Sequence, residues 1–351
     1  MVSVQPGSLV VVTGLNGHVA SCVALRLLQN GYKVRGTVRA APRAAYVVQA
    51  LSQYSDSLDV VEVPDIAKPG AFDVALEGAA AIIHISSPVT MDAKKPEEQY
   101  VPSVDGTLSI MRSAHATPSV TRFLYLGSIG SAVMNTKDPS KEIITGEDWN
   151  VMTEKAVENL NDPFIGFHIY IGSKLVAEKA AWAYMAQEKP SFSFSSILGA
   201  MAFGPIHKAV TQAPRQDVSL GQLYDTLANP PRVDGLSPVV STVWVHAYDI
   251  ADLFVASLTS EKTPGRRLVA CAGRMSWLQA AKILQKVYPD RPYPPETADA
   301  PCMNYPGADV IRFDTSLEEE LLGGKWRTLD DAVLSCARDL IKKEEDGWDK
   351  L

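Results

Sequence analysis

The first half of the chain alternates between short apolar runs and longer stretches with apolar residues at helical spacing. Residues 9–13 read LVVVT, and residues 19–28 follow a helical pattern that Gly31 is placed to end. A short, β-branched apolar run is typical of a strand buried inside a parallel sheet. Helices such as one over 107–116 separate four more expected strands, at 33–38, 58–63, 79–85 and 123–126. This alternation predicts an α/β fold with a doubly wound parallel sheet.

The second half of the chain follows a different pattern. Residues 206–240 and 290–310 are rich in proline and polar residues and show little periodicity. We expect these segments to form loops that do not build the sheet. Apolar patterns predict ordered segments around them, at 244–258, 276–287 and 329–342.

The composition is that of a packed globular protein. Of the 351 residues, 46% are hydrophobic and 21% are charged, which argues against disorder over most of the chain. The net charge of −7 argues against nucleic acid or an anionic membrane as a partner. The N-terminus shows no signal-peptide pattern and no apolar run approaches the length of a membrane span. We therefore expect a cytoplasmic protein that does not associate with membranes.

The cysteines suggest no metal site. They stand at positions 22, 271, 302 and 336, far apart and without a C-x-x-C spacing. This arrangement favours reduced thiols over a zinc site or a disulfide framework.

The charge is unevenly distributed along the chain. Residues 1–55 contain no Asp or Glu but carry five basic residues: Arg26, Lys33, Arg35, Arg39 and Arg43. A basic region within an acidic protein indicates a small anionic ligand.

A glycine-containing turn joins the first predicted strand to the first predicted helix. It reads Thr13-Gly14-Leu15-Asn16-Gly17-His18-Val19-Ala20. Glycine lets the backbone turn and approach a pyrophosphate, and the helix N-terminus offers N–H groups and the positive end of its dipole. We expect Gly14, Asn16, Gly17, His18 and Val19 to bind a dinucleotide; a purely structural turn is the alternative.

The end of the second predicted strand indicates which dinucleotide the protein binds. NAD-binding sites usually place an acid there to bind the ribose 2′-hydroxyl. Here the strand ends in Arg39, and no acid occurs before Asp56. Because an arginine pairs with a 2′-phosphate, Arg39 favours NADP(H) over NAD(H). The alternative is an ordinary solvated surface charge.

Polar residues also follow the third and fourth predicted strands. Asp65 and Ile66 come after the third, where the carboxylate of Asp65 is placed to bind an adenine amine or to cap a helix. Ile85, Ser86 and Ser87 close the fourth strand. The carboxyl edge of an open parallel sheet is where ligands bind, so all five are candidate cofactor contacts.

Tyr170 and Lys174 are the candidate reactive pair. They stand four residues apart in a helical stretch, so their side chains share one helix face. A free tyrosine has a pKa of about 10, and a neighbouring ammonium lowers it by stabilising the phenolate. The phenol can then protonate the alkoxide that forms when hydride reaches a carbonyl. Lys174 can also hold the nicotinamide ribose.

A third group is expected to polarise the carbonyl oxygen. The segment Gly127-Ser128-Ile129-Gly130-Ser131 follows the fifth predicted strand. Ser128 is the first candidate for this role and Ser131 the second. A serine that only shapes a glycine-containing turn is the alternative.

With these residues together, the chain resembles the extended short-chain dehydrogenase/reductases. It is most similar to the branch of dihydroflavonol reductase, cinnamoyl-CoA reductase and the fungal aldehyde and ketone reductases. The resemblance covers nearly the whole chain. Its motifs fall on Thr13, Gly14, Gly17 and Ala20, on Val34-Arg35-Gly36-Thr37-Val38-Arg39, on Ser128, on Tyr170 and Lys174, on Phe203-Gly204-Pro205, and on Val245-His246 with Asp249-Ile250-Ala251.

The resemblance implies a Rossmann-type fold with a smaller, mainly C-terminal substrate lobe. Residues 1–200, with 241–260 returning to them, would form the NADP(H)-binding lobe, and residues 201–351 most of the substrate lobe. Arg39 would grip the 2′-phosphate. Gly199 and Met201 would lie beside the cofactor. Candidate contacts to the substrate are Ser131, Met134, His168, His207, Leu220 and Tyr224.

The chain departs from the pattern of this branch at four positions. Leu126 and Gly127 replace the first two residues of a T-S-S segment. Gly199 stands where proline is usual, and Asp105 replaces an asparagine. None of these changes removes a proposed catalytic group, but they bear on the shape of the nicotinamide pocket.

The function predicted from the sequence is NADPH-dependent reduction of an aldehyde or ketone to an alcohol, with a small-molecule carbonyl as substrate. A sugar-nucleotide epimerase or a hydroxysteroid dehydrogenase/isomerase is one alternative. A non-catalytic NADP(H)-binding sensor is another, although such proteins often lose the tyrosine or the lysine. Monomer and homodimer are both compatible with the sequence.

Overall fold

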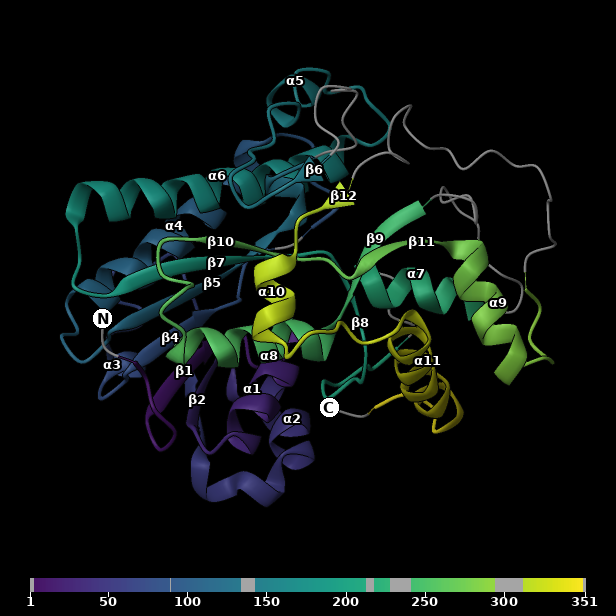
Figure 1. Ribbon diagram of the computed structural model, residues 1–351, viewed down its shortest axis with the longest axis horizontal. Helices are drawn as coiled ribbons and strands as arrows, with labels where there is room; N and C mark the ends of the chain where they lie inside the picture. The colour runs from purple at the N-terminus through teal and green to yellow at the C-terminus, as the bar shows by residue number, and fades with distance from the viewer. Residues whose placement is uncertain are drawn as a thin grey trace.

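A computed structural model gives the structure of the protein. It describes residues 3–88, 90–133, 143–212, 218–227, 241–293 and 312–349. Figure 1 shows a large sheet between two layers of helices, with a smaller group of elements at one side. Within the described residues, no helix is long and apolar enough to cross a membrane.

The main sheet has seven strands in the order β10-β7-β5-β4-β1-β2-β3, and every neighbouring pair is parallel. The chain runs outward from β1 to β3 and then returns to place β4 on the other side of β1. This order confirms the predicted doubly wound α/β fold, and its reversal point lies between β1 and β4. The strands are β1 (Leu9–Thr13), β2 (Lys33–Val38), β3 (Leu58–Glu62), β4 (Ala81–His84), β5 (Arg122–Ser128), β7 (Ser193–Gly199) and β10 (Arg267–Ala270).

Helices bury both faces of the sheet, and the strands nearest its centre, such as β1 (LVVVT) and β4 (AIIH), are accordingly almost entirely apolar. In β1, Val10 and Val12 face one helical layer and Val11 faces the other. The first layer contains α1 (His18–Gln29), α2 (Ala45–Ala50) and α8 (Ala247–Thr259), and the second contains α3 (Asp73–Leu76), α4 (Glu97–His115) and α6 (Ile165–Glu188).

A second apolar core lies beside the sheet. Phe203, Leu223, Trp277 and Leu340 are among its buried residues. Its elements are the three-stranded sheet of β11 (Gly273–Ser276), β9 (Ser241–His246) and β8 (Met201–Phe203), with α7 (Val218–Leu227), α9 (Trp277–Val287) and α11 (Leu329–Glu345). A separate core of this kind is compatible with the substrate lobe predicted from the sequence, whose binding role stays a prediction.

Short elements connect these parts. They are η1 (Ala41–Ala44), η2 (Ser52–Ser57), η3 (Ile129–Ser131), α5 (Thr153–Ala156), α10 (Ser316–Leu321) and the parallel pair of β6 (Ile143–Ile144) with β12 (Arg312–Phe313). The helix α10 contacts β10 and α8, so part of the C-terminal segment packs on the main sheet. Residues 267–270 likewise return to that sheet as β10. Of the segment 241–260, α8 packs on the main sheet, whereas β9 belongs to the three-stranded sheet.

Thr13 joins the two strands at the reversal point. Its buried hydroxyl oxygen accepts hydrogen bonds from the N–H groups of Ile85 and Ser86, both at 2.9 Å. The same oxygen lies 2.9 Å from Nδ1 of His84. Since both acceptor positions of the hydroxyl are used, its hydrogen is donated to His84. Burial lowers the pKa of His84 to about 3, with a further contribution from Lys174, so this ring is neutral and able to accept.

We therefore expect Thr13→Val to destabilise the protein by about 2 kcal/mol, because two buried N–H groups and one imidazole nitrogen lose their partner while the shape is kept. Urea denaturation measures the change. Thr13→Ser keeps the hydroxyl and is the matched control. Equal stability of the valine and serine variants would contradict this account of Thr13.

Candidate active site

The dinucleotide turn has the geometry that close approach of a pyrophosphate requires. Gly14 adopts a positive φ of 70°, and a Cβ there would lie 3.1 Å from Cβ of Ser86. Gly17 is the N-cap of α1, and no side chain of the described residues caps this helix or places an acid in its first turn. The N-terminus of α1 thus remains open to an anion. The Ser86 hydroxyl is buried and has no hydrogen-bond partner among the described residues, which also fits a bound polar ligand.

The other predicted residues of this turn lie together but face different ways. Asn16 and Val19 are half-buried at the turn. His18 is buried, and its Nε2 lies 3.2 Å from the carbonyl oxygen of Pro205. That contact fixes the turn against the segment after β8, so the backbone of His18, rather than its ring, is available to a phosphate.

The basic region near the N-terminus separates into two groups. Arg26 pairs with Asp252 at 2.5 Å, and Arg35 pairs with Asp59 at 3.0 Å. Lys33, Arg39 and Arg43 are exposed. Arg39 follows the end of β2, where the adenosine end of a dinucleotide is expected in this fold.

An acid that the sequence analysis missed lies near Arg39. Glu62 ends β3 and pairs in register with Val38, and its carboxylate accepts the N–H of Ala41 at 2.5 Å. The carboxylate thus holds the turn after β2. Sheet pairing brings it close although it stands 23 residues after Arg39 in the sequence.

The candidates after β3 and β4 line the same edge. Asp65 is exposed and its Oδ1 accepts the N–H of Ala67 at 2.9 Å, which stabilises a turn. The next helix, α3, begins at Asp73 with Phe72 as its N-cap, so Asp65 does not have the predicted helix-capping role. Ile66 is half-buried and packs toward α4, where a Cβ on Gly106 would lie 2.9 Å from its Cδ1. Ile85 and Ser87 are half-buried at the carboxyl end of β4.

The predicted reactive pair is formed on α6. Nζ of Lys174 lies 5.7 Å from the centre of the Tyr170 ring. Tyr170 is half-buried, whereas Lys174 is buried and only 8% exposed. Burial lowers the pKa of Lys174 to about 8. A partly desolvated ammonium next to a phenol is the electrostatic arrangement that favours phenolate.

The predicted oxygen-polarising group lies at the end of β5. Ser128 is half-buried and pairs in register with Gly199, the last residue of β7. Its Oγ accepts the N–H of Gly130 at 3.1 Å. Because the hydroxyl oxygen is the acceptor in that bond, its hydrogen remains able to donate to a carbonyl oxygen.

The second candidate, Ser131, has a different environment. It is fully buried, and its hydroxyl contacts the Glu178 carboxylate, the Arg267 guanidinium and the carbonyl of Ser128. These partners use the hydroxyl, so the structure favours a supporting role for Ser131 over direct contact with a substrate.

Of the remaining substrate candidates, the structure brings Leu220 and Tyr224 together in the second core, against which the predicted cofactor contact Met201 also packs. Nε2 of His207 lies 2.8 Å from the Tyr248 hydroxyl on α8, and Nε2 of His168 lies 3.8 Å from Asp162. The Tyr224 hydroxyl donates to Glu344 within the second core. Leu220 is buried in the same core, Met201 accepts a contact from Thr242 on β9, and Met134 lies outside the described residues.

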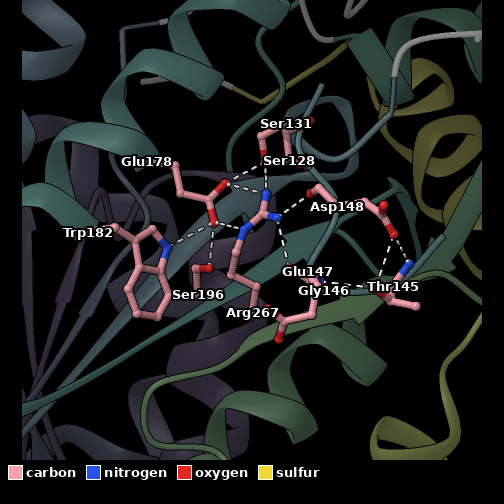
Figure 2. Close-up of polar contacts among 10 residues, drawn as sticks. All are labelled: Ser128, Ser131, Thr145, Gly146, Glu147, Asp148, Glu178, Trp182, Ser196 and Arg267. Atoms are coloured by element: carbon pink, nitrogen blue, oxygen red, sulfur yellow. Dashed lines mark hydrogen bonds and ion pairs between the residues drawn. The ribbon is translucent and has the colours of Figure 1, made fainter. Parts of the chain in front are cut away.

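Sequence reasoning also missed a buried ion pair behind Ser128. Glu178 is fully buried on α6, four residues after Lys174, and Arg267 begins β10. Figure 2 shows the guanidinium of Arg267 against the carboxylate of Glu178. The spacing of Tyr170, Lys174 and Glu178 along one helix face was the available signal for the acid, but nothing in the sequence pointed to its partner.

Comparison with known proteins agrees with this geometry. Residues 10–271 match the model of the NAD dependent epimerase/dehydratase family, and the chain belongs to that family. It is an extended short-chain dehydrogenase/reductase, as the motifs indicated, and its similarity to named reductases supports an oxidoreductase that binds a nicotinamide dinucleotide.

The relatives include enzymes named as reductases. Aldehyde reductase 2 of Sporidiobolus salmonicolor is 32% identical over 345 residues, which cover 96% of each chain. Cinnamoyl-CoA reductase CAD2 of Medicago truncatula is 27% identical and covers 85% of this chain and 86% of its own. The structure of yeast methylglyoxal/isovaleraldehyde reductase Gre2 complexed with NADPH superposes with a TM-score of 0.80, at 23% identity over 96% of this chain and 99% of that one.

The buried amine of Lys174 predicts a specific dependence of stability on pH. Its pKa in the folded protein is about 8, against an ordinary value of 10.5. Below pH 8 the folded protein must hold the charged amine, at a cost of about 3 kcal/mol in the free energy of unfolding. This cost disappears as the pH rises from about 8 to about 10.5.

We expect Lys174→Met to be more stable than the natural protein at pH 7 by up to about 3 kcal/mol, and the difference to shrink as the pH approaches 10. Urea denaturation at several pH values measures it. Lys179→Met, on an exposed lysine of the same helix, is the control and should show no such trend. A difference for Lys174→Met that does not change with pH would disprove the assignment.

Proposed function

We propose that this protein reduces an aldehyde or ketone to an alcohol by hydride transfer from NADPH. The observation that supports this most is the buried Lys174 amine 5.7 Å from the centre of the Tyr170 ring, on the helix α6 that packs against β5. The similarity to enzymes named aldehyde reductase, ketoreductase and cinnamoyl-CoA reductase supports the same reaction class.

The proposal gives Ser128, Tyr170 and Lys174 separate tasks in the chemical step. The bound dinucleotide supplies the hydride that adds to the carbonyl carbon. Ser128 donates a hydrogen bond to the carbonyl oxygen as the electron pair of the double bond moves onto it. Tyr170 gives its proton to that oxygen and completes the alcohol, and Lys174 stabilises the phenolate that remains. Tyr170 then takes a proton from solvent.

The open N-terminus of α1 and the turn at Gly14 would hold the pyrophosphate, and Lys174 would also bind the nicotinamide ribose. Arg39 would bind the 2′-phosphate of NADPH. Glu62 is the observation that favours the alternative, since a carboxylate near this position can bind the ribose hydroxyls of NADH instead. Use of NAD(H) would also be compatible with an NAD-dependent epimerase, and the cofactor experiment below separates NADPH from NADH.

The loss of the phenol hydroxyl should stop the reaction. We expect purified protein to oxidise NADPH in the presence of at least one carbonyl from a panel of aromatic and aliphatic aldehydes, ketones and β-keto esters. Tyr170→Phe should lower kcat by about 100-fold to 10,000-fold while NADPH still binds. Absorbance measures turnover and fluorescence measures binding. A fully active Tyr170→Phe enzyme would refute the proposed acid, and tight NADPH binding without turnover would favour a sensor.

The exposed guanidinium of Arg39 should determine the choice of cofactor. We expect Arg39→Gln to raise the KM for NADPH by about 10-fold to 100-fold, because a charge-assisted pair with phosphate is lost, and to leave the KM for NADH unchanged. Lys33→Gln, an exposed cation at the other end of β2, is the matched control. If natural protein uses NADH as well as NADPH, the role assigned to Arg39 is wrong.

A further inference from the structure

Glu178 and Arg267 form an ion pair that is almost completely shielded from water. Their side chains are 0% and 5% exposed. Nε of Arg267 lies 2.8 Å from one carboxylate oxygen, and Nη2 lies 3.3 Å from the other. Removing two charges from water is costly, and such a pair is tolerated only when further hydrogen bonds complete it.

Three other acceptors complete the hydrogen bonding of the guanidinium. Nη1 donates to the carbonyl oxygens of Gly146, at 2.8 Å, and Asp148, and Nη2 also donates to the Ser131 hydroxyl at 3.1 Å. With the two bonds to Glu178, all five N–H donors of Arg267 have an acceptor. The planar group also stacks 3.6 Å from the centre of the Trp149 ring. The orientation of Arg267 is therefore fixed from every side.

Ser131 connects this ion pair to the segment that carries Ser128. Its hydroxyl oxygen lies within hydrogen-bond distance of the second carboxylate oxygen of Glu178 and, at 2.8 Å, of the carbonyl oxygen of Ser128, and these two acceptors share its single hydrogen (Figure 2). Asn150, which follows the carbonyl partners of Arg267 in the sequence, holds the same turn. Its side-chain amide donates to the carbonyl of Gly130 at 2.7 Å, and its backbone N–H donates to the carbonyl of Ser131 at 2.9 Å. Three carbonyl groups at the end of β5 and in the turn after it, those of Ser128, Gly130 and Ser131, thus accept hydrogen bonds from Ser131 or Asn150.

Glu178 also belongs to the helix that carries the reactive pair. Tyr170, Lys174 and Glu178 follow one another at intervals of four residues, so they share one face of α6. A single carboxylate therefore links α6, which carries Tyr170, to Ser131 and so to the turn that follows Ser128.

We propose that Glu178 and Arg267, acting through Ser131, are positioning residues that hold the Ser128 hydroxyl at the distance from Tyr170 that the reaction needs. This inference rests on the proposed function, because it assigns a task to residues behind the same site. None of the three would touch the substrate. Their effect would be on the chemical step, since a small misplacement of a group that stabilises charge in the transition state slows that step strongly.

The chain offers a matched pair of variants for the test. Ser131 and Ser196 are both fully buried, and each donates one hydrogen bond to the Glu178 carboxylate, Ser196 at 2.6 Å from β7. Only Ser131 also bonds the carbonyl of Ser128. Serine variants are preferable to Glu178→Gln, which leaves a buried guanidinium without its counter-ion and risks loss of the fold.

The experiment measures kcat, KM and NADPH affinity for Ser131→Ala, Ser196→Ala, Ser128→Ala and the double variant Ser128→Ala/Ser131→Ala, with unfolding curves for each. We expect Ser131→Ala to lower kcat by about 10-fold with NADPH affinity unchanged, and Ser196→Ala to lower stability alone. Because Ser131 acts through Ser128, its substitution should change kcat less than about 2-fold in the Ser128→Ala background.

Equal kcat values for Ser131→Ala and Ser196→Ala, or effects that multiply in the double variant, would overturn the inference. The proposed function would still stand in that case, provided that the natural enzyme is active and Tyr170→Phe is inactive. A natural protein that reduces no carbonyl, or a Ser128→Ala variant with full activity, would overturn the catalytic assignment and this inference together.

Discussion

A buried carboxylate on α6 sets the geometry on which the candidate site depends. Glu178 accepts hydrogen bonds from side chains on β7 and β10 and from the turn after β5. Three separate parts of the sheet are thereby joined to the helix of Tyr170 and Lys174. Burying the charge of Glu178 is costly, and the hydrogen bonds to its carboxylate offset this cost only while every partner stays in place. The same condition makes the site rigid.

The sheet supplies the second requirement, which is that groups distant in the sequence meet at one edge. Because all seven strands are parallel, the carboxyl ends of β1, β4, β5 and β7 lie side by side. The turn at Gly14, the hydroxyl of Ser86 and the hydroxyl of Ser128 all follow such ends. Thr13 holds β1 and β4 together at the reversal point, where a nucleotide binds at the carboxyl edge of a sheet of this type.

The sequence was sufficient for those parts of the fold in which pattern and burial agree. The bounds of β1 and β2 were predicted to the residue, because β1 is an apolar, β-branched run and β2 follows the turn at Gly31 with its two valines on one face. Strand β7 was missed since it reads SFSSILG, and its buried serines are satisfied by Thr263 and Glu178 rather than by solvent. The start of α4 at Glu97 was also missed, because Pro102 and polar residues obscure its first turns.

The candidate site also contains residues that the sequence could predict and residues that it could not. Tyr170 and Lys174 follow from a local spacing that a helix preserves, and the structure brings them together. Arg267 stands 89 residues from Glu178, so no local rule could pair them. His207 and Tyr224 were chosen as polar aromatic residues in an irregular region, yet their polar atoms bond to Tyr248 and Glu344 within the folded chain. Side-chain type alone does not separate a ligand contact from an internal one.

Gly127 shows how a departure from the family pattern fits this arrangement. A serine is usual at this position in the reductases that the chain resembles. Here a Cβ would lie 2.9 Å from Leu198 and 3.3 Å from the Glu178 oxygen that Ser131 contacts. A larger residue would press on the carboxylate and, through it, on Arg267 and the turn of Ser128. The glycine therefore leaves space for the buried ion pair while Ser128, one residue later, keeps its hydroxyl at the edge of the sheet. The glycine at this position thus affects the packing around the Glu178–Arg267 pair and leaves the Ser128 hydroxyl, Tyr170 and Lys174 unchanged.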